Sequence, residues 1–384
     1  MPTSKRNRHK TWIEISESAL KNNFKIFRKL VGETKIFCVV KANAYGHGIL
    51  EVMGVLEKCN ADFYAVDDIS DALKIRAIGV TKPILVLGYT RLSNLKQAID
   101  NNISLTVYST EVLNHVLRLK CTKIAKIHIK VETGLNRQGI AGKELVKLVK
   151  LIKSHQDRFL LEGVSTHFAD IEDTLDPAYS QIQLKNYRNI VRSLNKYLPE
   201  HFYRHAAASA GSILYPETYL DAVRIGISLY GLWPSKETKL AYLLKKKNNI
   251  QLSPVLSWKS IIAQVKTVEK GEPVGYGRSW YAPKRSKIAI LPIGYFDGFD
   301  RGLSNIGRVI VSGSYASIIG RVAMNMIAID VSEVKNVKSE EEVIIIGRYG
   351  NKEITVEEIA QRIGTINYEV VSRLNQSIPR LLIK

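Results

Sequence analysis

The stretch FCVVKANAYGHG, residues 37–48, joins an apolar run typical of a buried strand to a lysine and a turn rich in small residues. From here to about residue 230, apolar runs of strand length alternate with amphipathic segments of helical spacing. Such alternation is typical of βα units around a parallel sheet and predicts an α/β fold. Eight predicted strands can close into a (β/α)8 barrel, although a doubly wound open sheet fits the same periodicity. The predicted strands are Ile36–Lys41, Phe63–Val66, Ile84–Leu87, Ser104–Tyr108, Lys126–Val131, Gly163–His167, Phe202–His205 and Ala222–Ile225.

The pattern of residue types changes after residue 240. Short β-branched runs are separated there by Gly, Asn and Ser, which is typical of a mainly β domain. One helix is predicted over Val356–Ile363, with Thr355 as its N-cap. We therefore predict a barrel over residues 14–240 and a mainly β domain over residues 241–384, which residues 1–13 can also join.

The chain has 384 residues, of which 45% are hydrophobic and 24% charged, as in ordinary globular proteins. Its net charge of +20 raises the question of nucleic-acid binding. Lys and Arg are spread along the whole chain, and the dense clusters at Lys5–Lys10 and Lys245–Lys247 contain no aromatic residues on which bases could stack. We therefore expect no specific nucleic-acid partner.

Cysteine usage and hydropathy indicate the compartment. Cys38, Cys59 and Cys121 are scattered, without the spacing of a disulfide framework or a zinc site, so no metal is expected. No apolar run reaches the roughly 18 to 20 residues that cross a bilayer. The basic N-terminus lacks the apolar segment of a signal peptide. These features predict a cytoplasmic protein without a membrane partner.

Lys41 is the first candidate for chemistry. A lysine at the end of an apolar strand is partly desolvated, which lowers the pKa of an amine and suits Schiff-base or general-base chemistry. A lysine that lays its aliphatic stem along apolar surface fits the same pattern. Both interpretations remain open on these residues alone.

The segment around Lys41 resembles the cofactor-lysine motif of the alanine racemases, which are fold-type III pyridoxal-phosphate enzymes. In that family the lysine binds the cofactor covalently, and Lys41 would do so here. Eight further segments resemble the family in chain order, which makes the resemblance specific over nearly the whole chain. They are His128–Ile140, Leu161–Phe168, Arg204–Ala210, Val223–Gly231, Val274–Gly277, Pro292–Gly298, Gly320–Asn325 and Gly364–Glu369.

The resemblance implies two catalytic bases, Lys41 and Tyr276, with Tyr276 contributed by the other subunit of a homodimer. Racemisation removes a proton on one face of the substrate and delivers one on the other, so two groups on opposite sides suit it. Tyrosine is ordinarily a poor base near neutral pH. The resemblance implies that His167 and Arg224 supply the cationic surroundings it needs.

The remaining roles are also carried over from the family. Arg224 would face the pyridine nitrogen of the cofactor, and Arg137 would contact the cofactor phenolate and the substrate carboxylate. Lys130 matches a lysine that many members carbamylate to orient this arginine. The implied phosphate contacts are Tyr45, Ser209, Tyr368 and the backbone N–H groups of Gly226 and Ile227, whereas Tyr295 and the backbone of Met324 would contact the amino-acid substrate.

Two segments depart from the family pattern. The usual Asn-Ser pair near the phosphate reads Ala208-Ser209, and the usual Val-Cys-Met-Asp reads Val322-Ala323-Met324-Asn325. These changes leave the catalytic roles in place but question strict preference for alanine, the substrate expected for supplying D-alanine to peptidoglycan.

Three related classes remain as alternatives. A racemase of the same family for serine or basic amino acids fits the departures described above. A single-barrel pyridoxal-phosphate carrier lacks the β domain and Tyr276, and related decarboxylases use a cysteine in the C-terminal domain, where this chain has none.

Overall fold

The computed structural model describes residues 8–245 and 250–384, so the basic clusters predicted at Lys5–Lys10 and Lys245–Lys247 lie partly outside the described residues. Contacts divide the chain into two compact units. We call them the barrel unit and the β unit. The domain limits 14–240 and 241–384 stay a prediction, because compactness alone does not show that a segment folds independently. The barrel unit comprises Ala19–Ala44 and Val52–Ser253, and the β unit comprises the chain up to Ser18, Tyr45–Glu51 and Pro254–Lys384.

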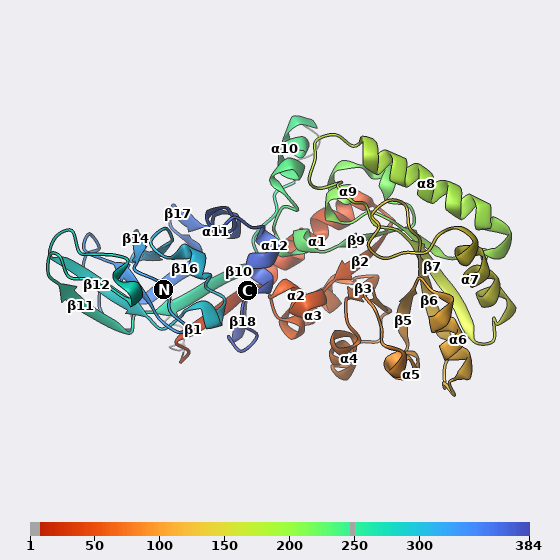
Figure 1. Ribbon diagram of the computed structural model, residues 1–384, viewed down its shortest axis with the longest axis horizontal. Coiled ribbons are helices and arrows are strands. Elements are labelled where there is room, and N and C mark those ends of the chain that lie inside the picture. The colour runs from red at the N-terminus through yellow and green to blue at the C-terminus, as the bar shows by residue number, and fades with distance from the viewer. Residues whose placement is uncertain (1–7, 246–249) are drawn as a thin grey trace. The chain divides into compact units, whose positions relative to one another are not determined.

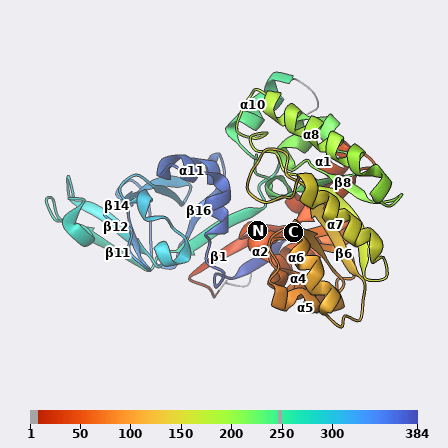
Figure 2. The ribbon, with the colours of Figure 1, turned by 45° about the vertical axis from the view of Figure 1, so that its right-hand side comes forward.

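The barrel unit contains eight parallel strands that close on themselves, since β2 pairs with both β3 and β9. This confirms the (β/α)8 prediction over the open sheet. Figure 1 shows helices alternating with these strands, and Figure 2 shows α4 to α7 along their outer side. The strands are β2 (Lys35–Val39), β3 (Phe63–Val66), β4 (Ile84–Val86), β5 (Ile103–Val107), β6 (Ala125–Lys130), β7 (Phe159–Ser165), β8 (Tyr203–His205) and β9 (Ala222–Ile225).

Most of the helices bury one apolar stripe, as amphipathic helices around a barrel do, whereas α9 is buried on all sides. In α7 the buried residues Leu145, Leu148 and Ile152 recur at helical spacing. Inside the barrel the rings of Phe37 and Phe63 stack with their centroids 4.3 Å apart. The helices are α1 (Glu17–Val31), α3 (Ile49–Leu56), α4 (Ile69–Ala77), α5 (Leu95–Asp100), α6 (Thr110–Arg118), α7 (Gly142–Ser154), α8 (Ala178–Leu194), α9 (Ser209–Leu214) and α10 (Lys236–Lys245).

The turn that carries Lys41 corrects one expectation. The strand was predicted to end on Lys41, but β2 ends at Val39, and Lys41 begins the short element α2 (Lys41–Tyr45). Ala42, Asn43, Ala44 and Tyr45 all have φ of 53°, so the turn is left-handed. Each such residue costs about 1–2 kcal/mol, because its Cβ approaches the following carbonyl oxygen. The surrounding structure must therefore enforce this conformation.

The β unit contains a ten-stranded sheet in the order β11-β12-β15-β14-β13-β16-β10-β1-β18, with β17 paired to β16. The sequence did not predict β1, which pairs antiparallel with β10 and parallel with β18. The strands are β1 (Thr11–Ser16), β10 (Leu256–Ile261), β11 (Gln264–Val268), β12 (Ser286–Leu291), β13 (Arg308–Val311), β14 (Ser314–Ile319), β15 (Ile327–Asp330), β16 (Glu342–Tyr349), β17 (Lys352–Ile354) and β18 (Arg380–Ile383).

Two helices complete the β unit. The predicted helix Val356–Ile363 is confirmed as α11, and the side chain of Thr355 caps it by accepting a hydrogen bond from the N–H of Glu358. The second helix is α12 (Asn367–Ser372). None of the helices in the described residues is long and apolar enough to cross a membrane.

Candidate active site

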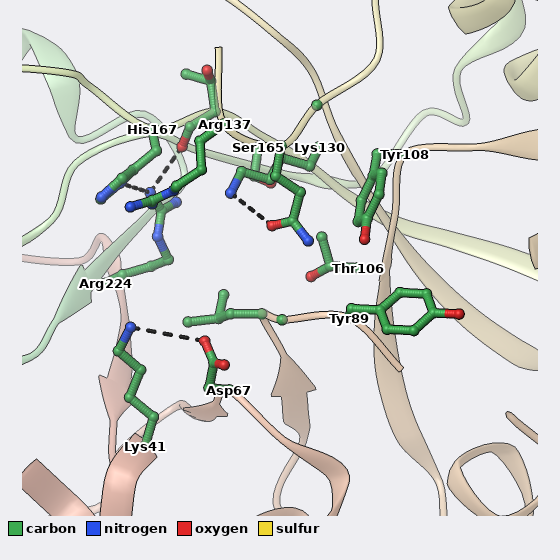
Figure 3. A pocket seen from close by; sticks show the side chains of 15 residues that line it. Lys41, Asp67, Tyr89, Thr106, Tyr108, Lys130, Arg137, Ser165, His167 and Arg224 are labelled. Atoms are coloured by element: carbon green, nitrogen blue, oxygen red, sulfur yellow. Dashed lines mark hydrogen bonds and ion pairs between the residues drawn. The ribbon is translucent and has the colours of Figure 1, made fainter. Parts of the chain in front are cut away.

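A cavity of about 720 Å³ opens at the ends of the barrel strands. Its lining residues lie at or just beyond the carboxyl ends of the strands, which is where catalytic residues of such barrels gather. Figure 3 shows their side chains converging on the cavity. The residues are Lys41, Asp67, Leu87, Gly88, Tyr89, Thr106, Tyr108, Lys130, Arg137, Gln138, Gly139, Ser165, Thr166, His167 and Arg224.

Lys41 shares this cavity with Asp67. Its Nζ lies 3.8 Å from Oδ1 of Asp67, which directly follows β3 (Figure 3). The side chain of Asp67 is 60% exposed, so the ion pair is screened by water and holds Lys41 only weakly. The sequence analysis missed Asp67, although an acidic residue directly after a predicted barrel strand is a signal for this position.

Three predicted cations, Lys130, Arg137 and Arg224, lie together in the same cavity. The amine of Lys130 donates a hydrogen bond of 3.2 Å to Oε1 of Gln138. Burial, followed by the charges of Arg224 and Arg137, lowers the pKa of Lys130 to about 8. The cavity is therefore suited to anionic groups, and Lys130 loses its proton more readily than an ordinary lysine does.

Arg224 reaches the cavity from β9 through a set of buried hydrogen bonds. Its Nη2 donates to the carbonyls of Thr166 at 2.9 Å and Ala206 at 2.8 Å, and its Nη1 donates to the carbonyl of His205 at 3.0 Å. Burial lowers the pKa of Arg224 to about 10, which still leaves it protonated at neutral pH. The guanidinium is thus held in one orientation as a fixed positive charge.

His167 lies beside Arg224. Nη2 of Arg224 is 3.4 Å from Nδ1 of His167, but its two hydrogens are already donated to the carbonyls of Thr166 and Ala206, so this third contact is a shared and weak one. Burial, and then the charge of Arg224, lower the pKa of His167 well below its usual range. His167 is therefore neutral, which corrects the expectation that both residues are cationic, because only Arg224 carries a charge here.

The five candidate phosphate contacts fall into two groups. In the barrel unit Ser209 begins α9, and its Oγ accepts a hydrogen bond of 3.1 Å from the N–H of Gly226, which Ile227 follows. In the β unit the rings of Tyr45 and Tyr368 lie 6.2 Å apart. The residues of each group therefore come from a single unit.

The three remaining candidates belong to the β unit. Tyr276 is 74% exposed and lies between Gly275 and Gly277, which both have positive φ. The segment of Tyr295 is joined to that of Met324 by backbone hydrogen bonds, including one from the N–H of Tyr295 to the carbonyl of Ala323 at 3.0 Å. A Cβ at Gly294 would lie 2.2 Å from that same carbonyl oxygen, so only glycine permits this approach.

Two family profiles match the chain. The alanine racemase N-terminal domain matches residues 15–234, and the alanine racemase C-terminal domain matches residues 255–382. The fold and the two profiles together define a two-domain racemase, a class of isomerases.

Known proteins give the same result over nearly the full length. Alanine racemase of Methanococcus maripaludis is 39% identical over 377 residues, covering 97% of this chain and 98% of its own. Alanine racemase of Leptospira interrogans is 35% identical, covering 99% and 98%. The crystal structure of alanine racemase from Bacillus anthracis, with bound L-Ala-P, superposes with a TM-score of 0.91 at 32% identity, covering 98% and 96%. This chain belongs to the alanine racemase family.

Proposed function

We propose that this enzyme interconverts L-alanine and D-alanine with pyridoxal 5'-phosphate as its cofactor. The observation that supports this most directly is the placement of Lys41 in one cavity with Arg137 and Arg224. The test is an absorbance spectrum of the purified protein, followed by chiral analysis of alanine incubated with it. A yellow protein that converts either enantiomer into the racemate supports the proposal, and a colourless protein that converts neither rejects it.

The residues present fit the cofactor. The cavity of about 720 Å³ is large enough for a pyridoxal ring together with a small amino acid, and it offers Lys41 for covalent attachment. The hydroxyl proton of Ser209 and the backbone N–H of Ile227 are donors suited to a phosphate, and the N–H of Gly226 would be shared between the phosphate and the Oγ of Ser209. When bound, the cofactor would supply the electron-withdrawing ring that makes the α-proton of the amino acid acidic.

The two-base mechanism assigns one proton transfer to each of Lys41 and Tyr276. Lys41 would remove or deliver the α-proton on one face of the substrate, and Tyr276 would serve the other. We assign Tyr276 to the site of the second subunit, which makes the active enzyme a homodimer. The exposure of Tyr276 on its own unit is compatible with such a role.

Subunit complementation tests the shared site. Variants Lys41→Ala and Tyr276→Phe should each be inactive alone. In a mixed dimer one site combines the intact Lys41 of one subunit with the intact Tyr276 of the other. Random re-association should therefore restore about a quarter of the wild-type activity. If mixing restores no activity although mixed dimers form, the two residues do not meet across an interface.

Arg137 and Arg224 have different parts in this mechanism. Arg224 has no acceptor atom, so it would leave the ring nitrogen unprotonated and weaken the ring as an electron sink, which restrains transamination. Arg137 would orient the substrate carboxylate. A carbamate on Lys130 would give Arg137 an anionic partner in place of a repelling cation.

Physiologically, we propose a cytoplasmic enzyme that supplies D-alanine for peptidoglycan. A second candidate is a racemase of broader specificity, which is favoured by Ala323 and Asn325 beside Met324. Ala323 is half-buried and smaller than the cysteine usual in the family, and Asn325 is exposed and lacks the charge of the usual aspartate. Comparing D-amino-acid formation from alanine, serine and lysine separates the two candidates.

A further inference from the structure

A chain of hydrogen-bonded polar side chains crosses the inside of the barrel and ends at Arg224. Five consecutive strands, β5 to β9, contribute one member each. Nδ1 of His205 is 2.7 Å from Nη1 of Arg224, and Nε2 of His205 is 2.9 Å from Nδ1 of His128. The chain continues from Nε2 of His128 to Oε2 of Glu162 at 3.0 Å. The hydroxyl of Ser104 donates a further hydrogen bond to Glu162.

The position of every proton in this chain follows from one fact. A guanidinium can only donate, so Nδ1 of His205 accepts from Arg224 and carries no proton. The proton of the neutral His205 is therefore on Nε2 and is donated to Nδ1 of His128. The proton of His128 is then on Nε2 and is donated to Glu162, whose carboxylate accepts it.

Charge is confined to the two ends of the chain. Burial, and then the charge of Arg224, lower the pKa of His205 well below its usual range, so His205 is neutral. Burial by itself raises the pKa of Glu162, whereas the hydrogen bonds that it accepts from His128 and Ser104, and the charge of Lys126, lower it. Glu162 is therefore ionised at neutral pH. Among the described residues no carboxylate pairs directly with Arg224, and the two imidazoles connect its charge to that of Glu162.

The surroundings of the chain are apolar. His128 and His205 have no exposed surface, and the ring of Phe37 lies 6.2 Å from the first and 5.1 Å from the second. In such surroundings an unpaired charge is costly, and hydrogen bonds polarise one another more strongly than in water. Removing the charge of Glu162 should therefore change the hydrogen bonding of Arg224.

The backbone of β6 and β7 leaves room for these hydrogen-bonded side chains. Along β6 and β7, Ile127 pairs with Leu161 and His128 pairs with Gly163, so Glu162 is the extra residue of a β-bulge. A bulge re-aims a side chain out of the regular alternation of a strand. A Cβ at Gly163 would lie 2.3 Å from Nδ1 of His128, so glycine leaves the space that the imidazole fills.

We propose that Glu162, acting through His128 and His205, is a positioning residue that orients Arg224 and balances its charge. The inference rests on the proposed function, in which Arg224 faces the ring nitrogen of the cofactor. A guanidinium cannot accept a proton, so the chain does not conduct protons into the cavity. Its effect is on the direction and strength of the hydrogen bond that Arg224 donates there.

Nitrogen-15 NMR of the cofactor-loaded protein tests the arrangement without any turnover. At neutral pH, His128 and His205 should both be neutral with the proton on Nε2. Glu162→Gln keeps an acceptor for His128 but removes the charge, so it should retain both tautomers and shift the guanidinium signals of Arg224. Either histidine protonated on Nδ1 in the wild type, or Arg224 signals unmoved in Glu162→Gln, overturns the proposal.

The ratio of transamination to racemisation tests the consequence. With its balancing charge lost, Arg224 should polarise the ring nitrogen more strongly. Glu162→Gln should therefore release about tenfold more pyruvate per alanine racemised, the scale of one hydrogen bond to a charged group. The control is Lys126→Gln, because the amine of Lys126 lies 3.8 Å from Oε1 of Glu162 but outside the chain. Equal ratios in the two variants overturn the proposal.

The outcomes separate the inference from the proposed function. If the protein racemises no amino acid but shows the expected tautomers and the shift of the Arg224 signals, the proposed function is rejected and the inference about the hydrogen-bonded side chains stands. A racemase with a different tautomer pattern rejects the inference alone. Glu162→Gln is nearly isosteric, so the test does not depend on a variant with an empty space in the barrel.

Discussion

The amine of Lys130 and the side-chain amide of Gln138 form a hydrogen bond of 3.2 Å on the wall of the cavity. The amide is neutral, so it does not offset burial and the charges of Arg224 and Arg137, which lower the pKa of Lys130 to about 8. Carbon dioxide adds only to a neutral amine, forming a C–N bond and releasing a proton. A lysine with a lowered pKa therefore reacts with it at lower pH than an ordinary lysine.

We predict that Lys130 is carbamylated, and that the carbamylated fraction rises as the pH is raised through about 8. Carbon-13 NMR with labelled bicarbonate should show one carbamate signal in the wild type and none in Lys130→Met. Lys126→Met, on the same strand, is the control and should keep the signal. A wild-type spectrum without a carbamate at saturating bicarbonate would contradict the prediction.

The second prediction concerns the attachment of the cofactor. Borohydride reduction of the yellow protein should fix pyridoxal on Lys41, and peptide mapping should locate it there. Lys130 lines the same cavity and is the natural internal comparison. Lys41→Ala should bind no cofactor covalently, whereas label on Lys130 in the wild type would reject the assignment.

The third prediction concerns Tyr276. Replacement by phenylalanine removes one of two proton-transfer groups, and a positioned side chain of this kind typically contributes about 10²- to 10⁴-fold. Tyr276→Phe should lose activity on this scale, and unequally between the L-to-D and D-to-L directions. Tyr281→Phe removes the hydroxyl of another exposed tyrosine of the same unit and should change little. Equal, few-fold effects in both variants would argue against two bases.

Substrate preference gives the fourth prediction. A small change in a pocket shifts discrimination by only about 1–3 kcal/mol, so Ala323 and Asn325 are sufficient to admit a slightly larger side chain. We expect alanine to be the best substrate and serine to be turned over measurably. The double variant Ala323→Cys/Asn325→Asp should lower kcat/KM for serine relative to alanine. An unchanged ratio would show that these positions do not set specificity.

Asp62 gives the fifth prediction, on stability. Its carboxylate accepts hydrogen bonds from the N–H of Ile36 at 3.0 Å, from Lys35 at 3.1 Å and from Arg28. Burial alone raises the pKa of Asp62, but these hydrogen bonds outweigh burial and lower it below 3.8. The stabilisation is therefore present above the pKa of the unfolded chain and is lost as the pH falls through the lower value of the folded one.

Asp62→Asn should thus unfold at lower denaturant concentration at pH 7, with a loss of about 1–3 kcal/mol. The difference in unfolding free energy between Asp62→Asn and the wild type should disappear at acidic pH. Glu333→Gln breaks the ion pair with Lys284 and is the control; because both side chains are exposed and water screens the pair, the denaturant midpoint should stay nearly that of the wild type. If this difference in unfolding free energy stays constant down to strongly acidic pH, the charge of Asp62 is not its cause.

The barrel was largely predictable because its strands are buried on both sides and appear as apolar runs. All eight lie within a few residues of their predicted positions. Closure of the barrel was not predictable from local pattern, since it depends on β2 pairing with β9 across most of the unit. The strand β1 was missed for a similar reason, because Thr11 and Glu14 interrupt its apolar pattern and its partners β10 and β18 lie near the other end of the chain.

The candidate site was predictable residue by residue but not in its conformation. Alanine rarely adopts positive φ, so nothing in Ala42 or Ala44 indicates a left-handed turn. The buried chain to Glu162 was also missed. Its local signal is a polar residue inside an apolar strand, as at His128, but sequence does not show which such residues meet inside a barrel.

The contact between Gly163 and His128 restricts the order in which this part of the barrel can change during evolution. A side chain at position 163 would place its Cβ 2.3 Å from Nδ1 of the imidazole, so it is tolerated only after His128 has been replaced by a smaller residue. A lineage that takes both steps can regain the histidine only after position 163 has returned to glycine, because the new side chain occupies its space. The two positions are therefore epistatic, and the path between their states always passes through the form with glycine at 163 and a smaller residue at 128.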